Sequence, residues 1–228
     1  MTIDFIYVIS LITEPHDISV KIKDLKMKTD TPFYVVPAIN GWDLQNGNAT
    51  SPYKKYNQAK WWKLDSNSNE PQNNWWSRDL TPGEIGCGLS HYSTIENAYN
   101  EGFENILILE EDFYGNGEKF PEWELNHLLD DWSMCYLGRN PIRPEKDIKV
   151  NEGLIQTAYS FNAHAYVLSR KGMKEIIDSN YLTNMIPWDE FLPAIAGVHD
   201  REDANKCFHN GFKQYSLPKN ILINQVII

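Results

Sequence analysis

The stretch that decides the fold spans residues 81–112 and reads TPGEIGCGLSHYSTIENAYNEGFENILILEED. Thr81 and Glu84 form a capping box around a proline at the first helical position, where each side chain can satisfy a free backbone N–H group. Gly102 is a suitable end for the helix that begins there. The apolar run over 103–109 suits a fully buried strand of a parallel sheet. The stretch therefore predicts a capped helix followed by a buried strand.

The predicted helix has two unlike faces. At 100° per residue, the large apolar side chains gather on one face and small side chains on the opposite face. The small face consists of Gly83, Gly86, Cys87, Ser90 and Thr94. Such a face permits close approach of another backbone or of a ligand, and the N-terminal end of the helix favours a phosphate. Tight packing and ligand binding are equally good interpretations.

The predicted strand ends in three consecutive carboxylates, Glu110, Glu111 and Asp112. Like charges this close repel one another, and a divalent cation would relieve the repulsion. Because residues i and i+2 of extended backbone point to the same side, Glu110 and Asp112 can share one ion while Glu111 faces elsewhere. Oxygen ligands with open positions suit Mn²⁺ or Mg²⁺ bound partly through a diphosphate. A solvated acidic turn is the alternative interpretation.

The rest of the chain indicates one α/β domain. Further strands are expected at 5–9, 33–36, 132–137 and 163–168, with a Lys-rich helix over 17–28 and another after Ser169. Alternating strands and helices predict a mostly parallel central sheet flanked by helices, with ligands at the carboxyl ends of the strands. A length of 228 residues fits a single domain over 1–228.

Residues 45–77 differ in kind, because they are rich in Asn, poor in aliphatic side chains and contain the Trp pairs 61–62 and 75–76. We interpret them as a long surface loop that orders over a bound ligand. Aromatic faces suit sugars, which are partly apolar and partly hydrogen-bonding, although each Trp taken alone is more often a packing residue.

Charge and composition exclude several classes of function. A formal net charge of −10 repels phosphate backbones and argues against nucleic acid as a partner. The longest apolar runs, 6–9 and 106–109, are far shorter than the roughly 18 to 20 residues of a membrane span. Neither terminus carries a targeting signal, so a cytoplasmic location is expected. The cysteines and histidines lack metal-site spacing, which predicts buried thiols at 87, 135 and 207 and structural roles for His91, His164 and His199.

Several ordered blocks point to a known family. They are RDLTPGEIGCGLSHY at 78–92, LILEED at 107–112, CYLGR at 135–139, AHAYVLSR at 163–170 and IPWDEFLP at 186–193. Together with YVISL at 7–11 and AING at 38–41, they resemble glycosyltransferase family 25 over nearly the whole chain. The last three blocks look closest to the C-terminal catalytic domain of procollagen galactosyltransferases.

The resemblance implies a GT-A-like fold, a UDP-hexose donor and an inverting transfer to an acceptor hydroxyl, with Mn²⁺ held by Glu110 and Asp112. It also implies that the nucleotide sugar is contacted by Ile9, Ser10, Arg78, Gly83, Ser90 and Glu111. We expect the base at Asp189 or Glu190, because carboxylates among aromatic residues and prolines have raised pKa values. Adjacent side chains cannot easily both point into one site, and we choose Asp189.

Two departures from the family pattern leave alternatives open. Residues 10–16 replace an Arg-rich loop, and the chain ends at Ile228 where relatives continue into a Ser-Asp segment. Either a ligand from that tail is missing or Gln225 stands near its place. The donor can be UDP-galactose or UDP-glucose, and the acceptor a hydroxylysine of a collagen-like protein, a lipopolysaccharide sugar or another glycan. A non-catalytic sugar- or nucleotide-binding protein of the same fold is the alternative function.

Overall fold

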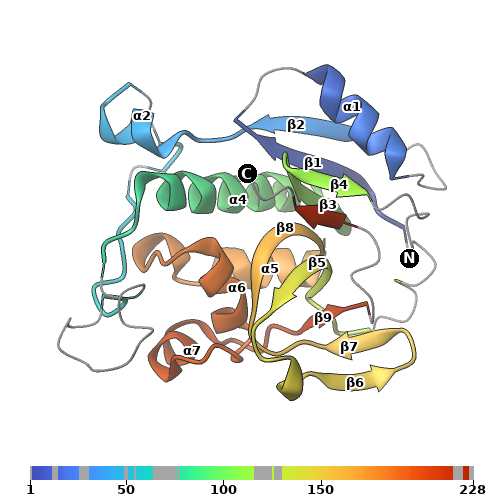
Figure 1. Ribbon diagram of the computed structural model, residues 1–228. Coiled ribbons are helices and arrows are strands. Elements are labelled where there is room, and N and C mark those ends of the chain that lie inside the picture. The colour runs from blue at the N-terminus through green and yellow to red at the C-terminus, as the bar shows by residue number, and fades with distance from the viewer. Residues whose placement is uncertain are drawn as a thin grey trace.

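The computed structural model describes residues 2–11, 15–25, 31–48, 51–53, 55–63, 76, 78–115, 125, 130–217 and 223–225. Within them, an eight-stranded sheet runs in the order β2-β1-β3-β8-β5-β9-β7-β6, and β4 pairs with β10 in a second sheet (Figure 1). The strands are β1 (Phe5–Ser10), β2 (Phe33–Pro37), β3 (Asn105–Glu110), β4 (Phe113–Gly115), β5 (Met134–Pro141), β6 (Ile148–Asn151), β7 (Leu154–Gln156), β8 (Ser160–Ser169), β9 (Gln214–Ser216) and β10 (Ile223–Gln225). The helices are α1 (Pro15–Asp24), α2 (Gly41–Gln45), α4 (Pro82–Glu101), α5 (Arg170–Asp178), α6 (Trp188–Ile195) and α7 (Glu202–Phe208), with 3-10 turns at Pro144–Lys146 and Tyr181–Thr183. The predicted α/β architecture is confirmed and is consistent with a GT-A-like fold.

Helix α4 begins and ends where the sequence predicts. The Thr81 hydroxyl accepts a hydrogen bond from the Glu84 backbone N–H at 3.2 Å, and the Glu84 carboxylate accepts one from the Thr81 N–H at 2.7 Å. Gly102 ends the helix at φ 90°, a left-handed conformation that glycine adopts without a Cβ clash. The cap fixes the helix that leads into β3, so the position of the acidic strand end follows from this stretch.

The sheet is mixed, and the prediction of a mostly parallel sheet is wrong. Strand β1 pairs in parallel with β2 and β3, and β5 with β9. Strand β8 runs antiparallel to both β3 and β5, and β7 runs antiparallel to β6 and β9. The chain passes from β5 to β8 through the hairpin of β6 and β7. Because β8 runs antiparallel to β5, this connection needs no crossover helix. Every side chain of β6 is exposed, so no buried apolar pattern marked it in the sequence.

Alternate residues of the strands supply two cores, one on each face of the sheet. Tyr7 and Ile9 pack in the cluster that contains α4, α5, α6 and α7. Ile6 and Val8 point to the other face, where Ile18 of α1 is part of the core. Because β1 and β3 are central and buried on both faces, their carboxyl ends are held rigidly side by side.

The small face of α4 divides between packing and the cavity described below. A Cβ atom on Gly86 would lie 2.3 Å from the carbonyl oxygen of Ile39. The Ser90 hydroxyl accepts a hydrogen bond from the Ile39 N–H at 2.8 Å and donates one to the Gly86 carbonyl at 2.7 Å. For Gly86 and Ser90 the structure supports the packing interpretation. Gly83 and Cys87 instead line the cavity.

The predicted surface loop over 45–77 is only partly described, since 49–50, 54, 64–75 and 77 lie outside the described residues. Trp62 and Trp76 are 1% and 7% exposed, so these two side chains belong to the core rather than to a surface loop. The prediction that the loop orders over a ligand stays a prediction.

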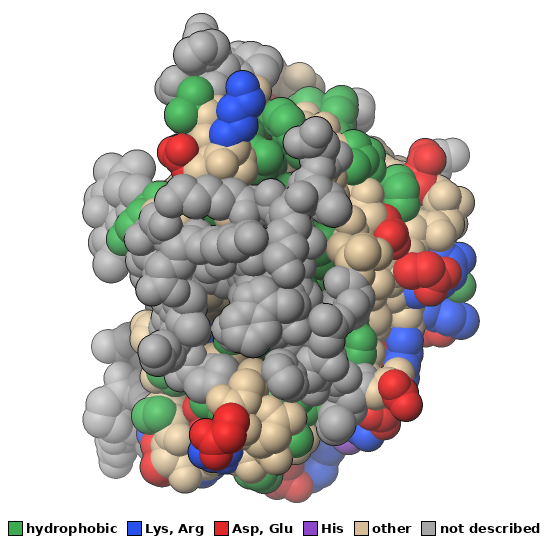
Figure 2. Space-filling view, turned by 90° about the vertical axis from the view of Figure 1, so that its right-hand side faces the viewer, with side chains coloured by type: hydrophobic (Ala, Val, Ile, Leu, Met, Phe, Trp, Pro, Cys, Tyr) green, Lys and Arg blue, Asp and Glu red, His purple; other side chains and the backbone are tan. Residues whose placement is uncertain are grey.

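The charges on the surface and the lengths of the helices bear on two expected absences, a nucleic-acid partner and a membrane span. On the face shown in Figure 2, acidic and basic side chains are interspersed, so the described side chains of this face form no basic patch of the kind that binds nucleic acid. No helix in the described ranges combines the length and apolarity needed to cross a bilayer. The expected cytoplasmic location stays a prediction.

Candidate active site

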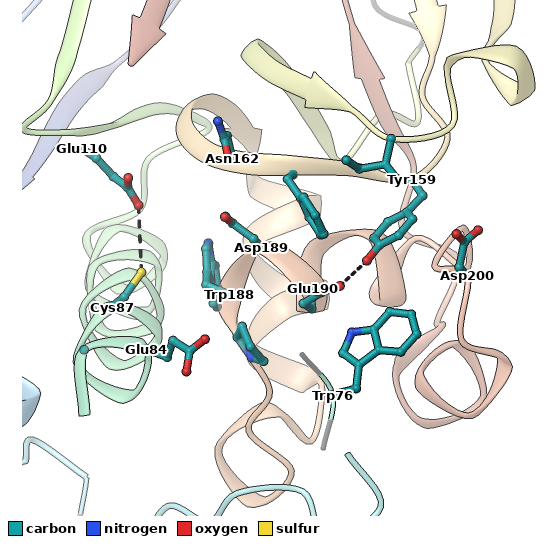
Figure 3. A pocket seen from close by; sticks show the side chains of 14 residues that line it. Trp76, Glu84, Cys87, Glu110, Tyr159, Asn162, Trp188, Asp189, Glu190 and Asp200 are labelled. Carbon is teal, nitrogen blue, oxygen red and sulfur yellow. Dashed lines mark hydrogen bonds between the residues drawn. The ribbon is translucent and has the colours of Figure 1, made fainter. Parts of the chain in front are cut away.

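A cavity of about 660 Å³ opens between α4, the end of β3, β8 and the start of α6 (Figure 3). Its lining is Trp76, Gly83, Glu84, Cys87, Glu110, Ile142, Tyr159, Phe161, Asn162, Pro187, Trp188, Asp189, Glu190 and Asp200. The volume suits a ligand of drug or nucleotide-sugar size. Five carboxylates and four aromatic rings line it, so it combines a negative field with flat apolar walls.

Glu110 contributes the carboxylate at the end of β3. Its Oε1 atom lies 3.0 Å from Nε2 of His91 and 3.9 Å from Sγ of Cys87. Burial is the largest influence and opposes ionisation, but the hydrogen bonds from His91 and Cys87 and the charges of His91 and His164 together outweigh it and hold the pKa of Glu110 below its usual value. Glu110 is therefore a carboxylate at neutral pH, and it carries a negative charge into the cavity.

Asp189, in the first turn of α6, is the second charged group of the site. Burial first, and then the negative charge of Glu110, raise the pKa of Asp189 to about 7. The backbone N–H groups of Ala163, at 2.9 Å, and Asn162 donate hydrogen bonds to its carboxylate and oppose that rise. Asp189 can therefore gain or lose a proton near neutral pH while two backbone groups hold its orientation.

The two N–H groups converge on Asp189 because of an irregularity in β8. The pairing of β5 with β8 shifts register on both sides of Gly138, and Asn162 adopts φ 67°. Among non-glycine residues, Asn tolerates this left-handed conformation best, and the conformation turns successive N–H groups to one side. Asn162 itself lines the cavity beside Asp189.

Glu190 is tied into the structure by its neighbours. Its Oε2 atom accepts a hydrogen bond from the Tyr159 hydroxyl at 2.6 Å and lies 2.7 Å from Nε2 of His199. Nδ1 of His199 accepts a hydrogen bond from the Arg201 N–H at 2.8 Å, so Nε2 carries the proton and donates to Glu190. This geometry favours Asp189 over Glu190 as the group that exchanges protons with a substrate.

Arg201 anchors the Trp-containing segment to the site. Its guanidinium donates hydrogen bonds to the carbonyl oxygens of Trp62, at 2.5 Å, and Trp61, at 2.8 Å. Its central carbon lies 4.6 Å from the Trp62 ring centroid and 5.5 Å from that of Trp76, within cation–π range. Trp76 also lines the cavity, so Arg201 positions one aromatic wall of the site.

The profile of glycosyltransferase family 25 (LPS biosynthesis protein) matches residues 3–131. The chain belongs to this family. The match covers β1, α4 and the acidic end of β3, but not the segment that carries Asp189.

Several relatives within the family are similar over more than half of the chain. A probable inactive glycosyltransferase 25 family member 3 of Rattus norvegicus is 35% identical over 142 residues, which are 58% of this chain and 24% of that protein. Procollagen galactosyltransferase 2 of Homo sapiens is 35% identical over 133 residues, 54% of this chain and 21% of the relative. A procollagen lysyl hydroxylase and glycosyltransferase of Acanthamoeba polyphaga mimivirus is 32% identical over 144 residues, 59% and 15% respectively. The aligned part thus spans at most about a quarter of these relatives.

The structure of this family 25 member brings some of the predicted donor contacts together. The Glu111 carboxylate accepts a hydrogen bond from the Ser10 hydroxyl at 2.5 Å, and the Glu111 N–H donates to the Ile9 carbonyl at 3.0 Å. These three residues lie together at the carboxyl ends of β1 and β3, outside the lining of the cavity. Glu111 therefore faces β1, away from the cavity that Glu110 lines. The sequence argument assumed extended backbone here, whereas residues 111 and 112 form a turn after β3.

The remaining predicted donor contacts are Arg78, Gly83 and Ser90. Arg78 forms a two-pronged ion pair with Glu84, with both N–O distances 2.7 Å, and it holds the pKa of Glu84 below its usual value against burial. Arg78 thus reaches the cavity through Glu84, and Gly83 lines the cavity directly. Ser90 is 1% exposed and does not line the cavity, so the structure gives it a packing role, and its contact with the donor stays a prediction.

Sequence reasoning missed five residues in or beside this site. Arg201 and Asp200 carried no signal, because they lie in a charged segment without apolar periodicity. Asn162 became visible only through its backbone conformation. Cys87 and His91, which are four residues apart on one helix, were each judged alone and interpreted as structural.

Proposed function

We propose that this family member transfers a hexose from a UDP-sugar to an acceptor hydroxyl, with Asp189 as the base and Mn²⁺ or Mg²⁺ at Glu110 and Asp112. One observation carries the proposal. A carboxylate with a pKa of about 7 and a charged strand-end carboxylate line the same cavity (Figure 3). A glycosyl transfer with inversion needs a proton acceptor near neutral pH and a neutralised diphosphate, and this pair suits both needs.

The residues present fit a divalent cation. Glu110 and Asp112 offer carboxylate oxygens, which Mn²⁺ and Mg²⁺ prefer. His91 and Cys87 both contact Oε1 of Glu110, so neither contact occupies Oε2. Glu110 lines the cavity, and Asp112 follows it in the turn after β3, outside the cavity lining but close enough for its charge to act on the Cys87 thiol. When bound, the cation would neutralise the charge that develops on the diphosphate leaving group.

Asp189 would remove the proton of the attacking hydroxyl. With a pKa of about 7, about half of its population is ionised at neutral pH. The N–H groups of Asn162 and Ala163 keep the carboxylate oriented through the reaction, and Glu190 holds α6 in place through Tyr159 and His199. A carboxylate that is held in a fixed orientation is a more effective base, because less reorientation is needed before the proton is transferred.

The relatives support two narrower readings of the same site. The name procollagen galactosyltransferase supports UDP-galactose as donor and a hydroxylysine of a collagen-like protein as acceptor, with UDP-glucose and glycan acceptors as the other choices. The name of the rat relative, probable inactive, supports a protein that binds a sugar or nucleotide without turnover. The base assigned to Asp189 favours the enzyme.

The test begins with binding. UDP-galactose and UDP-glucose are screened for thermal stabilisation of the chain with and without Mn²⁺, and transfer to collagen-like peptides and oligosaccharides is then measured. The proposal requires Mn²⁺-dependent stabilisation by one donor and transfer to one acceptor class. Stabilisation without either transfer or donor hydrolysis would support the binding protein instead.

A further inference from the structure

Three different metal-ligating side chains lie close together where α4 meets the end of β3, beside the cavity. Sγ of Cys87, a ring nitrogen of His91 and a carboxylate oxygen of Glu110 all lie within 4.8 Å of one another. We propose that these three side chains form a site for a thiophilic divalent cation of the Zn²⁺ class, distinct in its ligands from the all-oxygen pair of Glu110 and Asp112.

The distances between the donor atoms suit such an ion. Zn–N, Zn–O and Zn–S bonds of about 2.0, 2.1 and 2.3 Å at tetrahedral angles place N and O about 3.4 Å apart and S and O about 3.6 Å apart. The corresponding distances here are 3.0 Å from His91 Nε2 to Glu110 Oε1 and 3.9 Å from Cys87 Sγ to the same oxygen. These two distances differ from the tetrahedral values by a few tenths of an ångström, and the third pair, Cys87 Sγ and the His91 ring nitrogen, lies within 4.8 Å. Small rotations of the Cys87 and Glu110 side chains would complete the site.

The backbone that carries the ligands is rigid. Cys87 and His91 are four residues apart on α4, so their side chains lie one above the other on one helix face. Glu110 comes from the last position of β3, which pairs with β1 on one side and β8 on the other. Because helix and strand both belong to the core, the three donors stay close together without an ion.

The surroundings of His91 resemble the supporting groups of known metal sites. Nδ1 of His91 lies 2.7 Å from the Tyr166 hydroxyl, which fixes the orientation of the ring. The ring also stacks on Trp188 at a centroid distance of 5.1 Å and an interplanar angle of 16°. These contacts keep Nε2 directed at Glu110 and leave the imidazole little freedom to turn away.

The site is open on one side and lies in a negative field. Cys87 and Glu110 line the cavity, so an ion with three protein ligands would face solvent at its fourth position, as ions do in catalytic zinc sites. The carboxylates Glu110, Asp189, Glu84 and Asp112 all place negative charge around Cys87. A cation relieves that charge crowding and releases the thiol proton on binding.

The thiolate and imidazole would select the ion. Soft sulfur and nitrogen donors prefer Zn²⁺ over Mn²⁺ or Mg²⁺, which prefer oxygen. Since Glu110 belongs to both ligand sets, Zn²⁺ at Cys87 and His91 is expected to inhibit Mn²⁺-dependent transfer. This last consequence rests on the proposed function, whereas the site itself does not.

The experiment uses Co²⁺ as a spectroscopic probe on the whole chain freed of metal by a chelator. Thiolate ligation gives Co²⁺ an intense near-ultraviolet charge-transfer absorption. We expect one Co²⁺ per chain with this absorption in the wild type and in the matched controls Cys207→Ser and Asp112→Asn, and its loss in Cys87→Ser. Absence of the absorption in the wild type, or its persistence in Cys87→Ser, would overturn the proposal.

A second measurement needs no variant. At pH 9, where more of the free thiol is ionised and reacts, Zn²⁺ is expected to slow alkylation of Cys87 by iodoacetamide about tenfold or more, mapped by mass spectrometry, because a metal-bound thiolate is a poor nucleophile. An unchanged alkylation rate at Cys87 would overturn the site. If the chain shows Mn²⁺-dependent transfer but not the Co²⁺ absorption, the Cys87 site is wrong and the proposed function holds. If it shows the absorption but no transfer, the site holds and the proposed function is wrong.

Discussion

Asp189→Asn is expected to stabilise the fold while lowering the transfer rate by a factor on the order of 100 or more, and the stabilisation should grow with pH. The usual pKa of Asp is 3.8, whereas burial and the charge of Glu110 raise the pKa of Asp189 to about 7 in the fold. The folded state therefore keeps this proton to higher pH than the unfolded state does. Ionisation of Asp189 then lowers the free energy of unfolding by about 1.4 kcal/mol per pH unit, from about pH 4 to about pH 7.

The magnitude follows from that window. Above pH 7 the ionisation of Asp189 lowers the free energy of unfolding by at most about 4 kcal/mol. About 2 to 3 kcal/mol of this loss develops between pH 5 and pH 8. Asp189 borders an open cavity where solvent screens its charge, so we expect about half of these figures. Asn cannot ionise, and its oxygen can still accept the hydrogen bond from Ala163, so the variant avoids this cost.

The assay is urea unfolding of both proteins in the presence of a chelator. The stability gained by Asp189→Asn should be larger at pH 8 than at pH 5 by about 1 kcal/mol or more. An equal difference at the two pH values would refute the raised pKa, and with it the reason for choosing Asp189 as base.

Three further substitutions test other parts of the account. Asp112→Asn should abolish Mn²⁺-dependent donor binding because an amide lacks the charge that offsets a divalent ion, and unchanged affinity in calorimetry would remove that metal role. Gly86→Ala should destabilise the protein by about 1 to 3 kcal/mol, because the added Cβ would lie 2.3 Å from the Ile39 carbonyl oxygen. Gly83→Ala is the control and should be close to neutral, because its Cβ would have no neighbour nearer than 3.9 Å. Equal urea midpoints for the two variants would contradict the packing of α4. Arg201→Met should cost about 3 kcal/mol or more through lost carbonyl hydrogen bonds and weaken the near-ultraviolet circular dichroism of Trp, and wild-type values in both measurements would exclude Arg201 as the anchor.

Local signals made α4 and β3 predictable. The capping box, the terminal glycine and the apolar run each act within a few residues, so the sequence alone places the helix, the strand and the carboxylates Glu110 to Asp112. The proximity of Asp189 to Glu110 could be expected only from the family resemblance, because no spacing rule links residues so far apart.

What the sequence did not predict depends on non-local pairing. Strand β8 lies between β3 and β5, and its irregularity at Asn162 depends on the register with β5, which no local pattern specifies. The packing of Ser90 against Ile39 could not be predicted, because a small side chain on a helix face is equally suited to packing and to ligand binding. Arg201 bonds to backbone carbonyls of Trp61 and Trp62, and such contacts leave no trace in residue type or periodicity.

The most direct test of the central claim is the rate of UDP release at saturating donor and acceptor, with Mn²⁺ or with chelator, for the wild type, Asp189→Asn and Glu190→Gln. The account predicts Mn²⁺-dependent turnover in the wild type and a loss on the order of 100-fold or more in Asp189→Asn, with donor affinity retained. Glu190→Gln should keep measurable turnover and show mainly lower stability, because Glu190 is held by Tyr159 and His199. Near wild-type turnover in Asp189→Asn, or donor binding by the wild type with no turnover on any acceptor, would contradict it.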